Sequence, residues 1–266
     1  MLELRNISVI FNAGTPDENT ALNDINLNIK RGDFITVIGS NGAGKSTLYN
    51  AISGTIKPCS GQILLDKDEN GHVKNITNDA EYKRACYIGR IFQNPLLGTA
   101  GKMTLQDNMV ICMKKGPKSL RISLNAKMKA AFREQLKVLN MNLENRLNDN
   151  VEQFSGGQRQ ALTLLMAVMS KPEMLLLDEH TAALDPTNAD IIMKLTKQFA
   201  EQYNLTVMMV THNMQQALDY GNRLLMMDKG RIVLDISGKK KESLTMEDLT
   251  AEFKKIKINN DQMLLQ

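Results

Sequence analysis

A short glycine-rich run constrains the fold of this chain more than any other feature of its sequence. The run Gly39–Thr47 directly follows the apolar stretch Phe34–Ile38, and a helical pattern over Thr47–Ser53 comes after it. The run fits the motif G-x-x-x-x-G-K-[ST] in the strand-to-helix context that the motif requires. We therefore expect the strand–loop–helix unit of an α/β fold with a parallel sheet.

The loop of this unit predicts a phosphate-binding site. Its glycines let the backbone curl so that successive N–H groups point at phosphates, and the helix that follows adds its positive end. Lys45 is placed to reach the β- and γ-phosphates, and Ser46 to offer its hydroxyl to Mg²⁺. The sequence therefore predicts a nucleotide site made by Gly39, Ser40, Asn41, Gly42, Ala43, Gly44, Lys45, Ser46 and Thr47.

A second apolar strand, Met174–Asp178, ends in two adjacent carboxylates, Asp178 and Glu179. Ligands of open α/β sheets bind at the carboxyl ends of the strands, so Asp178 is expected beside the metal ion. Glu179 is one residue further on and points elsewhere, where it is placed to act on an attacking water as general base. The two acids therefore predict hydrolysis of the bound nucleotide.

A third motif, Phe154–Arg159, narrows the choice among proteins with such a loop. Its Ser155 and Gln158 form the pattern of a capping box at the start of a helix over Gly157–Met169. Two adjacent glycines cost helix stability there and expose backbone N–H groups at a helix N-terminus, which favours an anion. A second phosphate contact is therefore expected at Ser155, Gly156, Gly157 and Gln158.

With this motif the chain resembles the ATP-binding subunits of ABC transporters, whose signature is LSGGQ; here Phe154 replaces the leading Leu. The resemblance covers about residues 1–235 and implies that ATP is the nucleotide. Gln93 resembles the glutamine that senses Mg²⁺ and joins the core to a helical lobe. Asp185 resembles part of the D-loop at a dimer interface, and His212 the switch histidine that contacts the γ-phosphate and orders the water.

Two residues keep alternative interpretations. Phe11 stands where the family stacks an aromatic ring on adenine, but an aromatic residue in a strand also serves as core. His180 follows Glu179 where most ABC subunits carry Pro or Ala, and it either fills space or adds a proton-sensitive contact. The run Asp178–Pro186 is similar to that of a bacterial subgroup that works with a separate permease and a lipoprotein, which implies import of aromatic amino acids.

The amino-acid composition excludes several other classes of protein. A hydrophobic content of 42% with 23% charged residues excludes wholesale disorder, and the longest apolar stretch, Ala161–Met169, is too short to span a bilayer. Three widely spaced cysteines argue for reduced thiols and against a disulfide framework or structural zinc. A net charge of +4 is too mild to imply nucleic acid. We expect a soluble, cytoplasmic subunit held at the inner face of the cell membrane by its permease.

The positive charge is concentrated in one segment. Lys114–Arg146 contains nine Lys or Arg residues against two Glu residues. The segment is either a solvated helix surface or a face turned toward a membrane or a partner protein. The two interpretations stay open at the level of the sequence.

The order of patterns predicts the fold class and domains. We expect an α/β P-loop NTPase core, with a parallel sheet flanked by helices, an N-terminal antiparallel β-lobe and an inserted helical lobe over about residues 96–150. The ATP-binding domain is expected over residues 1–240, and a tail over 241–266 with a helix at Met246–Ile256. The predicted strands are Leu2–Phe11, Ile25–Ile29, Phe34–Gly39, Gln62–Asp66, Tyr87–Phe92, Met174–Asp178, Val207–Thr211 and Arg223–Met227.

The resemblance implies an ATPase that powers a separate permease as a head-to-tail homodimer, with a substrate-binding lipoprotein as an indirect partner and no nucleic acid. The alternative is a soluble ABC-type ATPase with a mechanical or regulatory role. Mechanical proteins of this type usually carry two cassettes or a long coiled-coil insertion, neither of which this sequence has. A purely regulatory module is disfavoured because Glu179 and His212 are both present.

Overall fold

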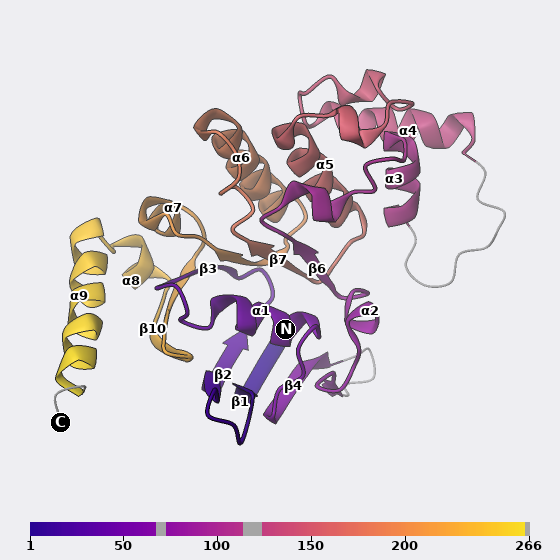
Figure 1. Ribbon diagram of the computed structural model, residues 1–266. Helices are drawn as coiled ribbons and strands as arrows, with labels where there is room; N and C mark the ends of the chain where they lie inside the picture. The colour runs from indigo at the N-terminus through magenta and orange to yellow at the C-terminus, as the bar shows by residue number, and fades with distance from the viewer. Residues whose placement is uncertain (68–72, 114–123, 264–266) are drawn as a thin grey trace. The chain divides into compact units, whose positions relative to one another are not determined.

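The computed structural model describes residues 1–67, 73–113 and 124–263, and Figure 1 shows their helices and strands. The chain divides into two compact units. Unit 1 comprises Met1–Arg84 and Thr206–Gln266, and unit 2 comprises Ala85–Leu205. Residues 114–123, the first part of the basic segment, lie outside the described residues. No described helix is long and apolar enough to cross a membrane.

Unit 1 contains the antiparallel sheet that the sequence predicts. Its strand order is β2-β1-β4-β5, with β1 at Leu2–Phe11, β2 at Asn19–Ile29, β4 at Ser60–Lys67 and β5 at Val73–Asn75. The buried residues of β1 alternate with partly or fully exposed ones on each side of an irregularity between Leu4 and Ile7, which is the pattern of a sheet with one covered face.

Unit 1 also contains the strand that carries the glycine loop. This strand, β3 at Phe34–Gly39, lies between β8 at Thr206–Val210 and β9 at Arg223–Asp228 and is parallel to both. An antiparallel strand, β10 at Arg231–Ser237, pairs with β9. Strands β3 and β8 are buried almost throughout, which explains their continuous apolar sequence. The helices of this unit are α1 at Lys45–Ser53, α2 at Glu81–Arg84, α7 at Met214–Asp219, α8 at Lys239–Glu242 and α9 at Met246–Met263.

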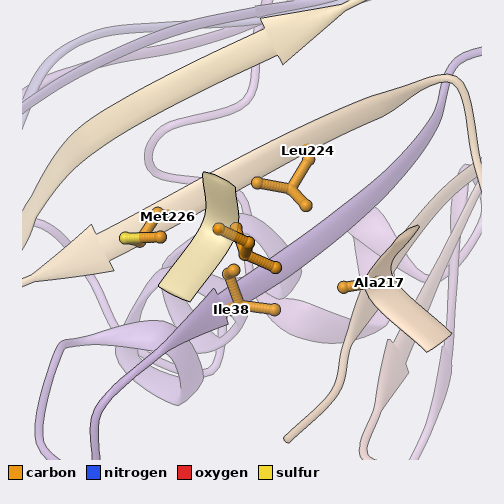
Figure 2. Packing of buried hydrophobic residues seen from close by; sticks show 5 residues of the cluster. Ile38, Ala217, Leu224 and Met226 are labelled. Atoms are coloured by element: carbon orange, nitrogen blue, oxygen red, sulfur yellow. The ribbon is translucent and has the colours of Figure 1, made fainter. Parts of the chain in front are cut away.

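A buried cluster fixes the end of β3 just before the glycine loop. Ile38 of β3 meets Leu224 and Met226 of β9 and Ala217 of α7 in this cluster, as Figure 2 shows. Leu249 of α9 completes the cluster and is fully buried. The C-terminal helix therefore contributes to the core that supports the loop, while the domain boundary at residue 240 stays a prediction.

Unit 2 combines a pair of parallel strands with helices. Strand β6 at Ile88–Ile91 pairs with β7 at Met174–Asp178, and α5 at Gly156–Met169 is buried along most of its length. The other helices are α3 at Leu105–Met113, α4 at Ala126–Lys137 and α6 at Pro186–Gln202, with 3₁₀ turns at Pro95–Gly98, Leu143–Asn145 and Val151–Gln153. The described part of the expected helical lobe is thus helical, apart from its turns and one isolated bridge between Thr104 and Asn150.

Several predicted element bounds need correction. Strand β6 is shorter than the predicted Tyr87–Phe92, whereas β2 begins before Ile25 and β4 begins before Gln62. The C-terminal helix continues to Met263, beyond the predicted end at Ile256. Strands β5 and β10 were not among the predicted strands.

Candidate functional site

The glycine loop of unit 1 passes so close to its neighbours that side chains are excluded. A Cβ at Gly39 would lie 2.3 Å from the carbonyl oxygen of Met227, and a Cβ at Gly44 would lie 2.5 Å from that of Ala21. Gly44 also has a φ of 100°, which L side chains rarely adopt. Glycine is therefore required at both ends of the loop, independently of any ligand.

Lys45 is the first residue of α1, and its side chain folds back into the loop. Its ammonium Nζ donates to the carbonyl oxygens of Gly39 at 2.7 Å and Ser40 at 2.8 Å, and the residue is only 6% exposed. Ser46 is exposed beside it at the start of the helix. The loop therefore holds a localised positive charge at a helix N-terminus, which is the electrostatic setting that a polyphosphate needs.

The structure brings His212 to the same edge of the sheet as the glycine loop. Val37 of β3 is paired with Val210 of β8 in parallel, and Gly39 and His212 each follow two residues later. The Thr211 N–H donates to the Val37 carbonyl at 3.2 Å, which continues the pairing to this point. The His212 side chain is exposed.

Phe11 is the last residue of β1, where it pairs with Asn19. Its side chain is 38% exposed, so it is not a fully buried core aromatic. Stacking of this ring on a base stays a prediction.

In unit 2 a second pair of parallel strands ends in predicted site residues. Ile91 of β6 is paired with Leu177 of β7 in parallel, and Gln93 and Glu179 each follow two residues later. Gln93 is exposed, whereas Asp178 and Glu179 are half-buried. The carboxyl ends of two adjacent parallel strands therefore present an amide and two carboxylates at one edge.

Asp178 has a cationic neighbour that the sequence did not single out. Oδ2 of Asp178 accepts from Nη2 of Arg90 at 3.2 Å, and the Arg90 guanidinium lies 4.7 Å from the centre of the Phe92 ring. A charged residue inside the short apolar strand at Ile88–Ile91 is the signal that could have drawn attention to it.

His180 is buried with 2% of its surface exposed, and its Nε2 lies 3.1 Å from Oγ1 of Thr196 on α6. Burial lowers the pKa of His180 to about 4, so the ring is neutral near neutral pH. Its backbone carbonyl accepts from Nε2 of Gln160 at 2.7 Å. Gln160 and Thr196 were also absent from the predicted site, although each is a polar residue on the apolar face of a helix.

The predicted capping box at the start of α5 is confirmed. Oγ of Ser155 accepts from the Gln158 N–H at 3.2 Å, and Oε1 of Gln158 accepts from the Ser155 N–H at 3.1 Å. The helix begins at Gly156, one residue earlier than predicted. Ser155 and Gly156 are exposed, whereas Gly157 is buried, and a Cβ there would lie 2.5 Å from Oδ1 of Asn188. Gly157 therefore has a packing role of its own.

Asp185 begins α6 as its N-cap, with Pro186 as the first helical residue. Its carboxylate accepts from the Asn188 side chain at 2.6 Å and from the Asn188 backbone N–H at 3.1 Å. These two hydrogen bonds lower the pKa of Asp185 from its ordinary value. A Cβ at Gly156 would lie 3.6 Å from Cδ2 of Leu184, the residue just before Asp185, so this segment lies beside the start of α5.

Comparisons with known proteins agree with this arrangement. The family model described as ABC transporter matches residues 22–182. The tyrosine transport ATP-binding protein of Clostridioides difficile (strain R20291) is 43% identical over 254 residues, which cover 95% of this chain and 98% of that protein.

Solved structures share the fold over most of their length. The ATP-binding cassette MJ0796, a dimer in a post-hydrolysis state bound to ADP and Pi, has a TM-score of 0.71 and 29% identity, covering 89% of this chain and 98% of that one. The protein cbiO1 from Clostridium perfringens, part of the ABC transporter complex cbiONQ, has a TM-score of 0.74 and 26% identity, covering 94% of this chain and 93% of that one.

Proposed function

The chain belongs to the ABC transporter family, and from that membership we propose how its residues divide the work of binding and hydrolysing ATP. It is an ATP-binding subunit with the ABC cassette fold, and its activity is ATP hydrolysis coupled to transport. The resemblance and the P-loop α/β fold class given by the sequence are thereby confirmed.

The phosphates of ATP bind in the loop Gly39–Thr47. The position of the Lys45 ammonium, held by two loop carbonyl groups, is the single observation that carries this proposal. The Lys45 ammonium and the backbone N–H groups at the start of α1 bind the β- and γ-phosphates. Phe11, at the exposed end of β1, stacks on the adenine ring.

Mg²⁺ fits the oxygen donors that the chain offers. Ser46 has an exposed hydroxyl, Gln93 has an exposed amide, and Asp178 has a carboxylate that already faces a cation, Arg90. Hydroxyl, amide and carboxylate oxygens are the hard ligands that Mg²⁺ prefers. When bound, the ion would neutralise charge on the phosphate oxygens.

Glu179 acts as the general base. It takes a proton from the attacking water, whose oxygen forms a bond to the γ-phosphorus as the bond to the bridging oxygen breaks, giving ADP and phosphate. His212 contacts the γ-phosphate and orders the same water, and Gln93 links the site to the helical lobe. These roles come from the family resemblance and agree with the position of each residue at the end of a parallel strand.

Two copies of the chain complete each site head to tail. The second copy supplies the N-terminus of α5 and the segment at Asp185, and the related cassette MJ0796 is itself dimeric. The residues that would face the partner's nucleotide are Ser155, Gly156, Gly157, Gln158 and Asp185.

The dimer drives a separate permease in the cell membrane, with a lipoprotein that delivers the solute. The cargo is an aromatic amino acid, because a relative of nearly equal length is named for tyrosine transport and the run Asp178–Pro186 points to the same subgroup.

The proposal is tested by uptake of labelled tyrosine into proteoliposomes that contain this chain, its permease and its binding protein. Tyrosine should accumulate only with ATP on the side of this chain, and unlabelled phenylalanine should compete while glutamate should not. Uptake that is insensitive to ATP would contradict the coupling, and competition by glutamate would contradict the choice of cargo.

A further inference from the structure

Glu179 has a backbone conformation that most residues avoid. Its φ is 48°, in the left-handed region, directly after the buried strand β7. A residue with a side chain is strained there, and it keeps this conformation only where its neighbours fix it. The Ala182 N–H donates to the Glu179 carbonyl at 2.9 Å and closes the turn on one side. The next residue, His180, provides the contacts on the other side.

The His180 ring is anchored by a directional hydrogen bond. Oγ1 of Thr196 donates its single hydrogen to the Ile192 carbonyl at 2.8 Å, so toward the ring it is an acceptor. Nε2 of His180 is therefore the nitrogen that carries the hydrogen. Because the ring is also buried, the side chain is held to α6 at a fixed place.

The backbone of His180 is held from a different helix. Gln160 of α5 is fully buried, and its Nε2 lies 2.7 Å from the His180 carbonyl and 3.5 Å from the Phe92 carbonyl. Phe92 directly precedes Gln93, just as His180 directly follows Glu179. One side-chain amide thus lies between the segments that carry two of the proposed catalytic residues.

We propose that His180 and Gln160 are positioning residues that hold Glu179 in its productive conformation, and that Gln160 also positions Gln93 through the carbonyl group of Phe92. The inference rests on the proposed role of Glu179 as general base. It adds Gln160, which the sequence pattern does not single out, and gives His180 a positioning role in the site.

The residue type at position 160 follows from this arrangement. Two carbonyl oxygens need two N–H donors, and the amide of Gln160 supplies both from one atom. Within the described part of the chain, Oε1 of the same amide is buried and has no hydrogen-bond partner. A buried group with an unpaired acceptor is costly, and the two carbonyl groups that the nitrogen reaches offset this cost.

The position of Gln160 also connects binding to chemistry. Gln160 lies on α5, two residues after Gln158 of the capping box. The amide group of Gln160 therefore gives one route by which a movement of the start of α5, where the second nucleotide is proposed to bind, reaches Gln93 and Glu179.

The first test removes the acceptor for the His180 ring. Thr196→Val keeps the shape of the side chain and removes its hydroxyl, so kcat should fall about 10- to 100-fold while the ATP dissociation constant stays within about twofold. Thr163→Val on α5 is the matched control, because Thr163 is also buried and its hydroxyl also donates to the carbonyl four residues earlier, that of Arg159. An equal loss of kcat in both variants would overturn the proposal.

The second test asks whether His180 acts through Glu179. His180→Gln keeps an N–H donor at a similar reach and should retain most of the activity, whereas His180→Met should lose it. Combined with Glu179→Gln, His180→Met should lower the residual rate no further, because the group that it positions is already inactive. A further fall of the same factor as in the wild-type background would show general structural damage and would overturn the proposal.

The third test addresses Gln160. Gln160→Leu removes both donors at similar length and should lower kcat more than it weakens ATP binding; unchanged kcat would overturn its role. Should this variant fail to fold, Thr196→Val still tests the positioning of Glu179 through His180, since that change is isosteric. Failure of the positioning role can be told apart from failure of the proposed function. If Glu179 is not the general base, Glu179→Gln alone retains wild-type hydrolysis.

Discussion

Arg90 and Asp178 form an ion pair between neighbouring parallel strands, with Nη2 of Arg90 at 3.2 Å from Oδ2 of Asp178. Their side chains are only 13% and 16% exposed, so water screens this pair less than a surface pair. The guanidinium also faces the Phe92 ring, which limits its freedom. The carboxylate proposed to face Mg²⁺ is therefore held by a cation of the protein itself.

Replacing that cation should make the metal more important for stability. Arg90→Met leaves the Asp178 carboxylate without its partner and should lower the free energy of unfolding by about 1–3 kcal/mol. Mg²⁺ with ATP would return a positive charge to the carboxylate, so it should raise the melting temperature of the variant more than that of the wild type. Thermal melts with and without Mg-ATP measure both effects.

The control for this prediction is Arg5→Met, since Arg5 pairs with Glu3 at the surface, where both side chains are well exposed. Its free energy of unfolding should change little, because water screens this exposed pair. An Arg90→Met protein whose melting temperature responds to Mg-ATP no more than the wild type would show that Arg90 and the metal do not share Asp178.

Lys45 should be essential for both binding and hydrolysis. Lys45→Ala removes the ammonium that the Gly39 and Ser40 carbonyl groups hold inside the loop, so ATP affinity should fall and hydrolysis should be lost. Equilibrium titration with a fluorescent ATP analogue and phosphate release measure the two effects. Lys194→Ala, an exposed position on α6, should change neither, and full turnover in Lys45→Ala would refute the assignment of the loop.

The elements that the sequence predicts most closely are those that depend on local chemistry. Strands β1, β3 and β7 have the predicted bounds, because each is a clear apolar or alternating run between turn residues. The capping box at Ser155 is likewise a pattern of four consecutive residues.

Elements without a strong local signal were missed. Strand β5 has only exposed residues, so no alternation marks it. Strand β10 follows β9 through a two-residue turn, Lys229–Gly230, where both φ angles are positive; Lys at the first position hides the usual Asn-Gly or Asp-Gly signal.

The unpredicted part of the site has a different cause. Arg90, Gln160 and Thr196 act on residues that are 88, 20 and 16 positions away in the chain. Their roles depend on which strand and which helix face they meet after folding. A single sequence contains no spacing rule for such contacts, whereas the motif residues are recognised because they are consecutive.

The two glycines of the signature motif should separate by their effects. Gly157→Ala places a Cβ 2.5 Å from Oδ1 of Asn188, so the free energy of unfolding should fall by about 1–3 kcal/mol. Gly156→Ala meets nothing closer than Leu184 at 3.6 Å and removes a helix-destabilising glycine, so the variant should be at least as stable as wild type. Urea denaturation measures both changes.

Gly156→Ala should impair assembly of the dimer even though it does not lower the stability of the chain. Gly156 is exposed, and its methyl group in the Ala variant would stand at the helix start proposed to meet the partner's nucleotide. Gly156→Ala should therefore weaken ATP-driven dimerisation in a fully folded protein, measured by sedimentation. Normal dimerisation of this variant would remove Gly156 from the proposed nucleotide contact.

Glu179→Gln should trap the ATP-bound dimer. Gln keeps the shape of the side chain but cannot take a proton from water, and loss of general-base help costs about 10²–10⁴-fold in rate. ATP binding should be spared, because Lys45 and the proposed Mg²⁺ ligands are unchanged. Removing one negative charge beside the γ-phosphate also favours the closed state. The variant should therefore accumulate as a homodimer with ATP, whereas the wild-type chain without nucleotide should be largely monomeric.

Size-exclusion chromatography of Glu179→Gln with and without Mg-ATP measures this shift, with phosphate release followed in the same samples. Glu201→Gln near the end of α6 is the matched control, since Glu201 is exposed and should affect neither hydrolysis nor assembly. Wild-type hydrolysis by Glu179→Gln would transfer the role of base to another residue, with His212 the first candidate. Loss of hydrolysis without dimer formation would keep Glu179 as the base but contradict the completion of each site by a second copy.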